Sequence, residues 1–571
     1  RVQGDLADLA VPPSVEAVVA ARVDELPDAQ RAVLEPASVA GEEFASAAVR
    51  ALAADEVRKA VPEHLRALAG RQMVEALEEP DGAADHRFAH PMIRDVTYGG
   101  LLKRTRADLH ERLVLWAESA DLARDRTVEM EEVLGYHLEQ AHRLRVDLEP
   151  LDAHGLDLGR RAADRLGAAG RRALERGDMP AAANLLRRAA DVLPGDPASA
   201  ARLLVDAGQA EMESGRLEDA DAVVGRPPER GGGAGAPGLA GGAGGERTRL
   251  AYLTGGGPGD DEVAAQAQAA LDAFAAAHDD EGQATAWRLL LNVRLTGCRF
   301  EEAETAAGEI VVYATRAGNR LLVNRMLPVI AQLSLRGPMP ALDAMVRCRQ
   351  ILGDVAGDRQ AEAVARRALS HLRGMWGELD DARAELRRCR ADLEELGWVL
   401  DAALVCLDAA PVALLADDPA GAEAELQWAF DTLDAMGERN YVSTVAALLG
   451  EARYRAGRLR EAEEAVEFSR EVAAEGDVAT HIIWRSVHGK LRARHGDAGG
   501  VASCREAVAL AEGTDDLIAR ADALADLAEA MGVTGDADGE RATLRRALAL
   551  YEQKGSLVAV RRVARRLSVT A

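Results

Sequence analysis

The stretch Gly457-Arg458-Leu459-Arg460-Glu461-Ala462 decides the fold, because variants of it recur about every 40 residues along most of the chain. Most copies have a glycine followed within a few residues by a hydrophobic residue or proline and then an alanine, and an arginine-rich amphipathic helix follows each copy. A period of about 20 to 50 residues indicates a repeat array. Gly215 and Gly297 lie about two periods apart, which predicts one degenerate copy between them. The other copies begin at Gly177, Gly215, Gly297, Gly337, Gly377, Asp418, Gly496 and Gly535.

Each copy is expected to join two helices into a hairpin. Glycine ends the first helix in the left-handed conformation, and acidic residues or proline begin the second. The stretch Glu461–Ala473 is apolar at helical spacing, and its alanines let paired helices approach closely. Since one hairpin cannot bury its apolar face alone, neighbouring hairpins must stack. The sequence therefore predicts an all-α fold, an α-solenoid with first repeats in 121–224 and its main array in 261–571. The regular spacing disfavours the alternative, an alanine-rich helical bundle.

The composition agrees with thin layers of helices. The chain has 571 residues, of which 48% are hydrophobic but only 3% aromatic, and its net charge is −26. Such an acidic chain argues against a nucleic-acid-binding surface. The excess of Ala, Gly, Asp and Arg suggests a GC-rich genome, of actinobacterial origin. Lysine occurs only at Lys59, Lys103, Lys490 and Lys554.

The cysteines and the lack of apolar runs predict a cytoplasmic protein. The five cysteines form no Cys-x-x-Cys pair, and each falls in a stretch expected to be helical, so we expect reduced core thiols. The sequence shows no signal peptide and no apolar run of about 18 residues that could cross a membrane. Because the chain begins with Arg1, we expect a fragment whose N-terminal neighbour is missing. The cysteines are Cys298, Cys348, Cys389, Cys406 and Cys504.

The first 120 residues have a different pattern, which predicts a winged-helix domain over 27–120. Glu79-Pro80-Asp81-Gly82 is a turn signal between two expected strands, Gln72–Glu78 and His86–His90, which would form a two-stranded wing. Helices are expected to flank this wing on both sides. They are predicted at Val15–Leu26, Ala29–Val39, near Glu43–Ala53, Asp55–Ala69, from Ile93, and at Thr105–Ala120.

A glycine-rich stretch interrupts the repeats at 225–260. Residues 225–246 read GRPPERGGGAGAPGLAGGAGGE, where the second helix of a repeat should lie. Such a segment cannot form a helix, because glycine costs about 1 kcal/mol and proline about 3 kcal/mol per helical position. Two interpretations stay open: a flexible linker, or a local reading-frame error in a GC-rich gene.

The sequence offers no catalytic or metal-binding pattern, so we expect this chain not to be an enzyme and to hold no metal. A phosphate-binding Walker A loop needs Gly-Lys followed by Ser or Thr, but the only Gly-Lys pair, Gly489-Lys490, precedes Leu491. His86 and His90 lie four residues apart, but a proline follows and no third zinc ligand is evident.

The segment Phe88-Ala89-His90-Pro91-Met92-Ile93-Arg94-Asp95-Val96-Thr97-Tyr98 carries a family resemblance. It resembles F-R-H-x-L-I-R-D-x-x-Y, which closes the winged-helix domain of signal-transduction ATPases with numerous domains, the STAND class. It is also similar to the Met-His-Asp motif of plant and animal immune receptors. Residues 1–26 look like the end of the preceding ATPase lid, and the repeats resemble the tetratricopeptide-like sensor arms of large actinobacterial members. Some of those members carry an adenylate cyclase domain, and others a LuxR-type DNA-binding domain.

The resemblance implies a role for His90, and the alternative is that His90 only caps or packs at a strand–helix junction. In that family the histidine at this position reaches the β-phosphate of bound ADP and holds the resting state closed, while Arg94 and Asp95 would brace the helix by an ion pair. The sequence departs from the family at Ala89, where cyclase-linked members usually have Arg, and at Pro91, where immune receptors have Asp.

The implied function is a regulatory arm. Its partners would be an upstream nucleotide-binding domain, which binds ATP or ADP, and a protein, peptide or small-molecule ligand on the repeats. No cofactor is expected in this chain itself, and no direct contact with nucleic acid or membrane. Activation would lead to homo-oligomerisation and to cyclase or transcriptional output. The alternative is a nucleotide-independent scaffold that binds peptides or proteins on its repeats. A third hypothesis, an enzyme whose catalytic part is this chain, lacks convergent catalytic residues.

Overall fold

The computed structural model describes residues 13–77, 84–119, 127–148, 150–193, 196–225, 247, 250–251, 254, 259–497 and 499–569. The chain divides into two compact units. The N-terminal unit comprises Arg1–Gly170 with Arg188–Ala200, and the repeat unit comprises Arg171–Arg187 with Ala201–Ala571. The predicted all-α class is confirmed, with a small sheet in the N-terminal unit. Most of the predicted glycine-rich interruption lies outside the described residues, so both of its interpretations stay open.

The N-terminal unit consists of helices around a small three-stranded sheet. Its hydrophobic core forms where α2 and α5 pack on the strands, around Val33, Leu34, Leu65 and Phe88. Its elements are α1 (Pro13–Asp24), α2 (Asp28–Ala40), β1 (Glu43–Phe44), α3 (Ser46–Leu52), α4 (Asp55–Arg58), α5 (Val61–Gly70), β2 (Val74–Ala76), β3 (His86–Phe88), α6 (Pro91–Gly100), α7 (Lys103–Ser119) and α9 (Thr127–Val146).

The sheet of this unit contains one strand more than the predicted wing. The expected antiparallel pair is present as β2 and β3, and β1 pairs with the other edge of β3 to give the order β1-β3-β2. The helix expected near Glu43–Ala53 is therefore wrong at its first three residues, and α3 begins only at Ser46. The Phe44 side chain is buried, and its carbonyl oxygen accepts from the Asp85 amide at 3.1 Å, which holds this segment extended.

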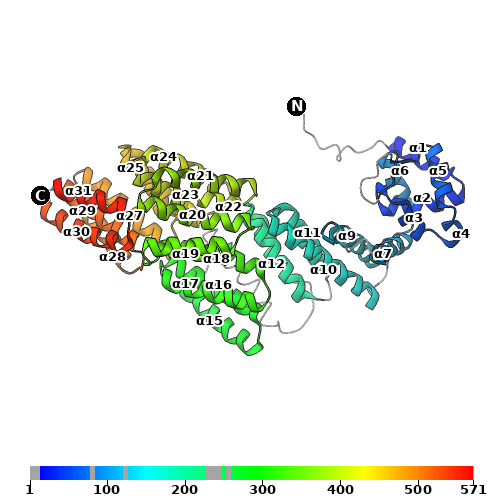
Figure 1. Ribbon diagram of the computed structural model, residues 1–571, viewed down its shortest axis with the longest axis horizontal. Helices are drawn as coiled ribbons and strands as arrows, with labels where there is room; N and C mark the ends of the chain where they lie inside the picture. The colour runs from blue at the N-terminus through cyan, green and yellow to red at the C-terminus, as the bar shows by residue number, and fades with distance from the viewer. Residues whose placement is uncertain are drawn as a thin grey trace. The chain divides into compact units, whose positions relative to one another are not determined.

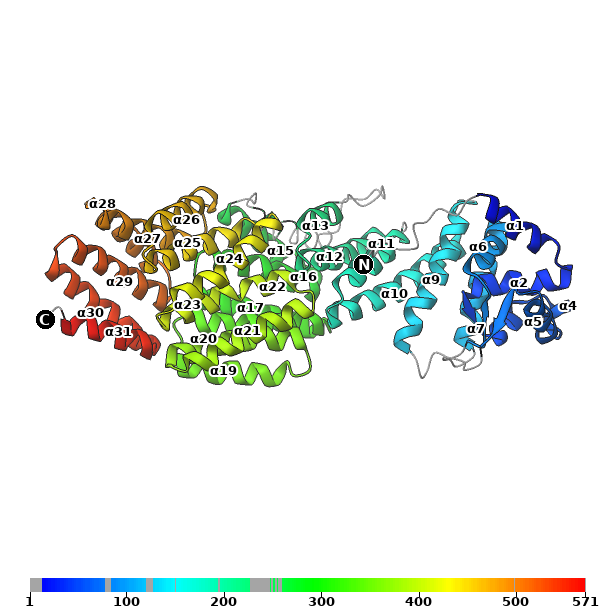
Figure 2. The ribbon, with the colours of Figure 1, turned by 90° about the horizontal axis from the view of Figure 1, so that it is seen from above.

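The repeat unit consists of stacked helical hairpins (Figures 1 and 2). Helices α10 and α11 lie across the boundary between the two units, and α31 follows the last complete hairpin. The hairpins are α10 (Ala153–Arg176) with α11 (Met179–Asp191), α12 (Pro197–Glu213) with α13 (Leu217–Val224), α16 (Asp280–Thr296) with α17 (Phe300–Arg316), α18 (Arg320–Arg336) with α19 (Ala341–Asp354), α20 (Arg359–Trp376) with α21 (Leu379–Glu395), α22 (Val399–Leu404) and α23 (Cys406–Leu415) with α24 (Pro419–Ala435), α25 (Asn440–Arg455) with α26 (Leu459–Val472), α27 (Val478–Arg494) with α28 (Gly499–Glu512), and α29 (Leu517–Val533) with α30 (Ala537–Lys554); α15 (Asp260–Ala277) and α31 (Leu557–Val569) complete the set.

The turn inside each hairpin is the recurring sequence, as predicted, with informative exceptions. At Cys298 and Asp417 the left-handed residue is not glycine, with φ of 51° and 55°. Cys298 therefore lies in a turn, and the expectation that every cysteine is helical is wrong there. Gly337 has φ −68°, so the end of α18 lacks a left-handed cap. The predicted left-handed glycines are confirmed at Gly177, Gly215, Gly377, Gly457, Gly496 and Gly535.

Close helix approach explains a second glycine position, seven residues or about two helical turns before the glycine of the hairpin turn. A Cβ atom at Gly489 in α27 would lie 2.4 Å from Cys504 Sγ of α28. Likewise, a Cβ atom at Gly450 in α25 would lie 2.8 Å from the Val466 side chain of α26. No larger side chain fits between these helices without a shift of the backbone.

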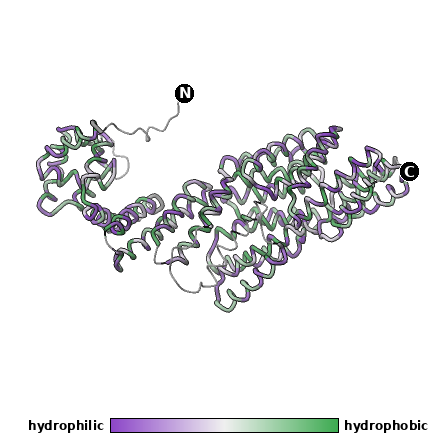
Figure 3. Tube along the Cα trace, turned by 180° about the vertical axis from the view of Figure 1, so that it is seen from behind, coloured by the Kyte–Doolittle hydropathy of each residue, from purple (hydrophilic) through white to green (hydrophobic). Residues whose placement is uncertain are grey.

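Hydrophobic and hydrophilic residues alternate along the helices of the array (Figure 3), so each hairpin buries one face against its neighbours. All five cysteines are buried and free. Within the described ranges, the structure contains no helix that is both long enough and apolar enough to cross a membrane.

Candidate functional site

The Phe88–Tyr98 segment begins at the end of β3 and forms α6. Phe88 is buried in the core, which fixes the end of the strand. His90 is the N-cap residue of α6, with an extended backbone (φ −152°, ψ 137°), and Pro91 occupies the first helical turn, where its missing N–H costs nothing. The sequence thus places His90 at a strand–helix junction.

The side chain of His90 is exposed and held in one orientation. Its Nδ1 accepts a hydrogen bond from the backbone N–H of Met92 at 3.1 Å. Because Nδ1 is the acceptor, the proton of the neutral ring resides on Nε2. His90 therefore presents one N–H donor at the N-terminus of a helix, a place that favours a negatively charged ligand.

Arg94 attaches α6 to α2. Its Nε donates to the carbonyl oxygen of Ser38 at 3.0 Å. The ion pair expected with Asp95 is present at 2.9 Å, but more than half of the Asp95 side chain is exposed. Such a pair contributes at most about 1 kcal/mol, so the bond to α2 is the better-protected contact.

Tyr98 begins a buried hydrogen-bond chain that the sequence did not predict. Its ring lies between the guanidinium groups of Arg94 and Arg106, at 5.2 Å and 5.1 Å. Its hydroxyl hydrogen-bonds His110 Nε2 of α7 at 2.9 Å, and His110 Nδ1 lies 2.8 Å from His137 Nδ1 of α9. The end of the motif therefore connects α6, α7 and α9.

Both histidines of this hydrogen-bond network, His110 and His137, are neutral at pH 7. Burial lowers the pKa of His110 to about 3, and the neighbouring ring and arginines add to the effect. Burial lowers the pKa of His137 to about 4, with Arg94 as the lesser cause. A neutral imidazole has one donor and one acceptor nitrogen, so the three side chains can pass hydrogen bonds in one direction.

The candidate metal ligands His86 and His90 have separate partners. His86 Nδ1 lies 2.8 Å from Asp85 Oδ1, and its ring stacks on Phe44. In the described part of the chain no group of three or more His, Cys, Asp or Glu side chains is arranged to hold a metal ion.

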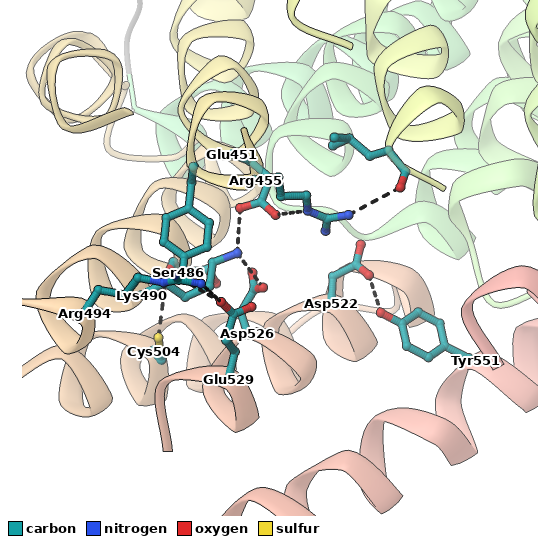
Figure 4. Close-up of polar contacts among 12 residues, drawn as sticks. Glu451, Arg455, Ser486, Lys490, Arg494, Cys504, Asp522, Asp526, Glu529 and Tyr551 are labelled. Atoms are coloured by element: carbon teal, nitrogen blue, oxygen red, sulfur yellow. Dashed lines mark hydrogen bonds and ion pairs between the residues drawn. The ribbon is translucent and has the colours of Figure 1, made fainter. Parts of the chain in front are cut away.

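In the repeat unit, Lys490 of the only Gly-Lys pair lies in a buried ionic cluster (Figure 4). Its Nζ lies 2.6 Å from Glu451 Oε2 of α25 and 2.7 Å from Asp526 Oδ1 of α29. Arg455 donates to the other oxygen of Glu451 at 2.6 Å. Although burial alone lowers it, the two carboxylates raise the pKa of Lys490 well above its usual range. The lysine is thus engaged in joining three repeats and does not face a phosphate.

Two tyrosines extend this cluster along α29. Tyr454 donates to Glu529 Oε1 at 2.5 Å and accepts from Arg494 Nε at 2.8 Å, while Tyr551 donates to Asp522. The cluster has charged groups of both signs, which is typical of ion pairs that fix the register of packed elements.

Comparisons with known proteins give no family. No family model matches the sequence, and no curated protein matches it. Similar solved structures include a Rap protein complexed with competence and sporulation factor (12% identity, TM-score 0.45, 65% of this chain and 99% of that chain). Another is the Cut9–Hcn1 hetero-tetramer of APC/C (12%, TM-score 0.38, 82% and 92%). A third is a STAND protein with a tetratricopeptide repeat sensor from Pyrococcus horikoshii (10%, TM-score 0.24, 98% and 68%). At these identities and TM-scores none of them carries a functional argument.

Proposed function

We propose that this chain is the regulatory arm of a STAND-type ATPase. The winged helix restrains an ADP-bound nucleotide-binding domain encoded upstream, and the repeats bind a protein, peptide or small-molecule ligand. Ligand binding frees the winged helix, permits exchange of ADP for ATP and promotes homo-oligomerisation in the cytoplasm. The output is cyclase activity or transcription.

The geometry of His90 supports the nucleotide part of this proposal. The backbone of Met92 occupies Nδ1, so Nε2–H is available to an external acceptor on an exposed surface. A phosphate oxygen is a strong acceptor for such a donor, and the hydrogen bond is lost when the phosphate leaves. His90 thus fits a sensor of bound nucleotide, and any phosphoryl transfer belongs to the upstream domain.

The fold around His90 supports the restraining role. Arg94 ties α6 to α2, and Tyr98 ties it to α7 and α9 through His110. A displacement of His90 would therefore also displace α7 and α9, because hydrogen bonds connect α6 to them. The repeats support the sensor role, because solenoids offer extended surfaces to partners.

The test is His90→Ala in the protein that includes the nucleotide-binding domain. We expect release of a fluorescent ADP analogue to become at least about tenfold faster, as for the loss of one charge-assisted hydrogen bond. His64→Ala, on α5, is the matched control and should leave release unchanged. If wild type and His90→Ala release the ADP analogue at the same rate, His90 has no role in nucleotide binding. Turnover of ATP by this chain alone would refute the assignment of catalysis to another domain.

The second candidate is a nucleotide-independent scaffold. The stacked hairpins of the repeat unit favour it, and it needs no role for His90. An upstream reading frame without a nucleotide-binding domain would favour the scaffold and leave His90 as a helix cap.

A further inference from the structure

Helices far apart in sequence meet in the repeat unit at a nearly constant separation. Hydrogen bonds join residues 214 to 220 positions apart, between the segments 298–301 and 515, and between 334–339 and 554. We call α12–α19 the first winding and α22–α31 the second winding. Figures 1 and 2 show the two windings side by side. The hairpins therefore coil until the second winding lies against the first.

Most of the contacts follow one rule: the turn inside a hairpin of the first winding meets a loop between hairpins of the second. A Cβ atom at Gly215, in the turn between α12 and α13, would lie 3.0 Å from the side chain of Met436, which follows α24. The windings also meet outside a hairpin turn, because a Cβ atom at Gly476 would lie 2.8 Å from Asp260 Oδ2 at the start of α15. The separation is about five and a half repeats of 40 residues, which explains why unlike loops meet.

Asp515 caps a helix of the other winding. Its two carboxylate oxygens accept from the backbone N–H groups of Phe300 and Glu301, both at 2.8 Å. These amides open α17, whose own N-cap residue, Arg299, supplies no side-chain cap. A carboxylate at this position satisfies free N–H groups and complements the helix dipole. Asp515 therefore does for α17 what a local aspartate does elsewhere in the array.

Lys554 caps the opposite end of the adjacent helix. Its Nζ donates to the carbonyl oxygens of Gly337 at 2.6 Å, Met339 at 2.8 Å and Ser334 at 3.3 Å. The side chain is fully buried. These carbonyls lie at and just after the end of α18, where Gly337 lacks the left-handed conformation that most turn glycines have. A cation there satisfies free carbonyl groups and the negative end of the helix.

We propose that Asp515 and Lys554 form a latch that holds the two windings of the repeat array together, and that releasing both lets the second winding move away from the first. The latch replaces caps at two turns that depart from the repeat pattern, at Cys298 and at Gly337. Those departures make the first winding depend on a partner about 217 residues away. The inference concerns the array alone and does not rest on the nucleotide role of His90.

The latch has a functional consequence for α27 and α29, the first helices of two hairpins in the second winding. While it is closed, the ends of α27 and α29 pack on the first winding, since Val478 and Ile518 contact its hydrophobic core. Opening the latch breaks these contacts between windings. It leaves each hairpin intact, because the two helices of a hairpin belong to the same winding. The array can therefore lengthen without unfolding, which is how a sensor could report a bound partner.

The experiment is hydrogen exchange on the full chain with Asp515→Ala and Lys554→Met. Asp515→Ala should raise exchange of the Phe300 and Glu301 amides at least about tenfold, although these amides are over 200 residues away. The matched control is Asp516→Ala at the adjacent residue, which caps its own helix by accepting from Ile518 and Ala519 at 2.9 Å. That control should raise exchange near 518–519 and leave 300–301 protected.

The double variant should also increase the radius of gyration in small-angle X-ray scattering. Asp515→Asn and Lys554→Gln retain part of each cap and serve if the stronger variants fail to fold; they should give the same changes at smaller size. The inference is overturned if exchange at 300–301 is the same in wild type and the Asp515 variants. An unchanged radius of gyration in the folded double variant also overturns it.

Discussion

At the scale of single residues, the His110–His137 pair makes the N-terminal unit sensitive to acid. The folded pKa values, about 3 and about 4, lie below the ordinary value of 6.5, so the unfolded chain binds more protons between pH 6.5 and pH 4. Stability from these residues is therefore complete above pH 6.5 and falls as the pH drops through that window. Each histidine should cost about 1.4 kcal/mol per pH unit once it is fully protonated in the unfolded state.

The measurement is amide protection of α7 and α9 in the full chain between pH 7 and pH 4.5, corrected for intrinsic exchange. The wild type should lose protection as the pH falls, and the variant with both His110→Gln and His137→Gln should lose much less. His64→Gln should behave like wild type. The same slope in wild type and the double variant would show that these rings do not titrate as described.

The sequence could predict His90 at a helix start but not its surroundings. Proline after a strand fixes the junction locally. The chain Tyr98–His110–His137 joins three helices, and no local pattern announces that their side chains meet. The partners of Lys490 were equally hidden, since they lie one repeat away on either side.

At the scale of elements, close packing inside a hairpin gives a paired prediction on two helical glycines. A Cβ atom at Gly489 would lie 2.4 Å from Cys504 Sγ and 2.6 Å from the Gly500 carbonyl oxygen, whereas one at Gly308 in α17 would meet nothing within 4 Å. Gly489→Ala should therefore destabilise the protein by about 1–3 kcal/mol through overpacking. Gly308→Ala should stabilise it by about 0.5–1 kcal/mol, because alanine restricts the unfolded chain.

Urea unfolding of the two variants, followed by circular dichroism, checks both signs. Opposite shifts of the midpoint are the expected result. If Gly489→Ala stabilised the protein as Gly308→Ala does, α27 and α28 would not approach as closely as the structure has them.

Element boundaries followed from the sequence where a period was long enough to detect. Hairpin helices of 13 to 18 residues show several turns of apolar spacing, as in α26 and α30. Strand β1 has two residues, too few for a period-two alternation to distinguish it from the helix that follows. The sequence does not predict the left-handed conformation of Cys298, because such a conformation is rare for cysteine and the preceding glycine satisfies the expected pattern.

At the scale of the whole repeat unit, the 40-residue period predicts that hairpins stack but not how far they coil. Coiling depends on a small rotation per repeat, which many side chains set together. The two windings meet only after the rotations of about five repeats have added up. The sequence pattern of one repeat and its neighbour therefore cannot predict which loops meet. In a linear solenoid each repeat contacts only its neighbours. Here the second winding also contacts the first, so removing part of the second winding should lower the stability of the first.

Truncation tests this coupling between windings. A chain ending at Gly513 lacks α29–α31 together with Asp515 and Lys554. A linear array would lose protection only next to the cut, in α27 and α28. The structure instead predicts that exchange also rises, by about tenfold or more, at the start of α17 and the end of α18, where the lost caps lay. A chain ending at Ser556 is the control, because it removes α31 but keeps both capping residues, and it should leave 300–301 protected. If residues 300–301 and 334–339 stay protected in the chain that ends at Gly513, the first winding does not depend on the second for its stability.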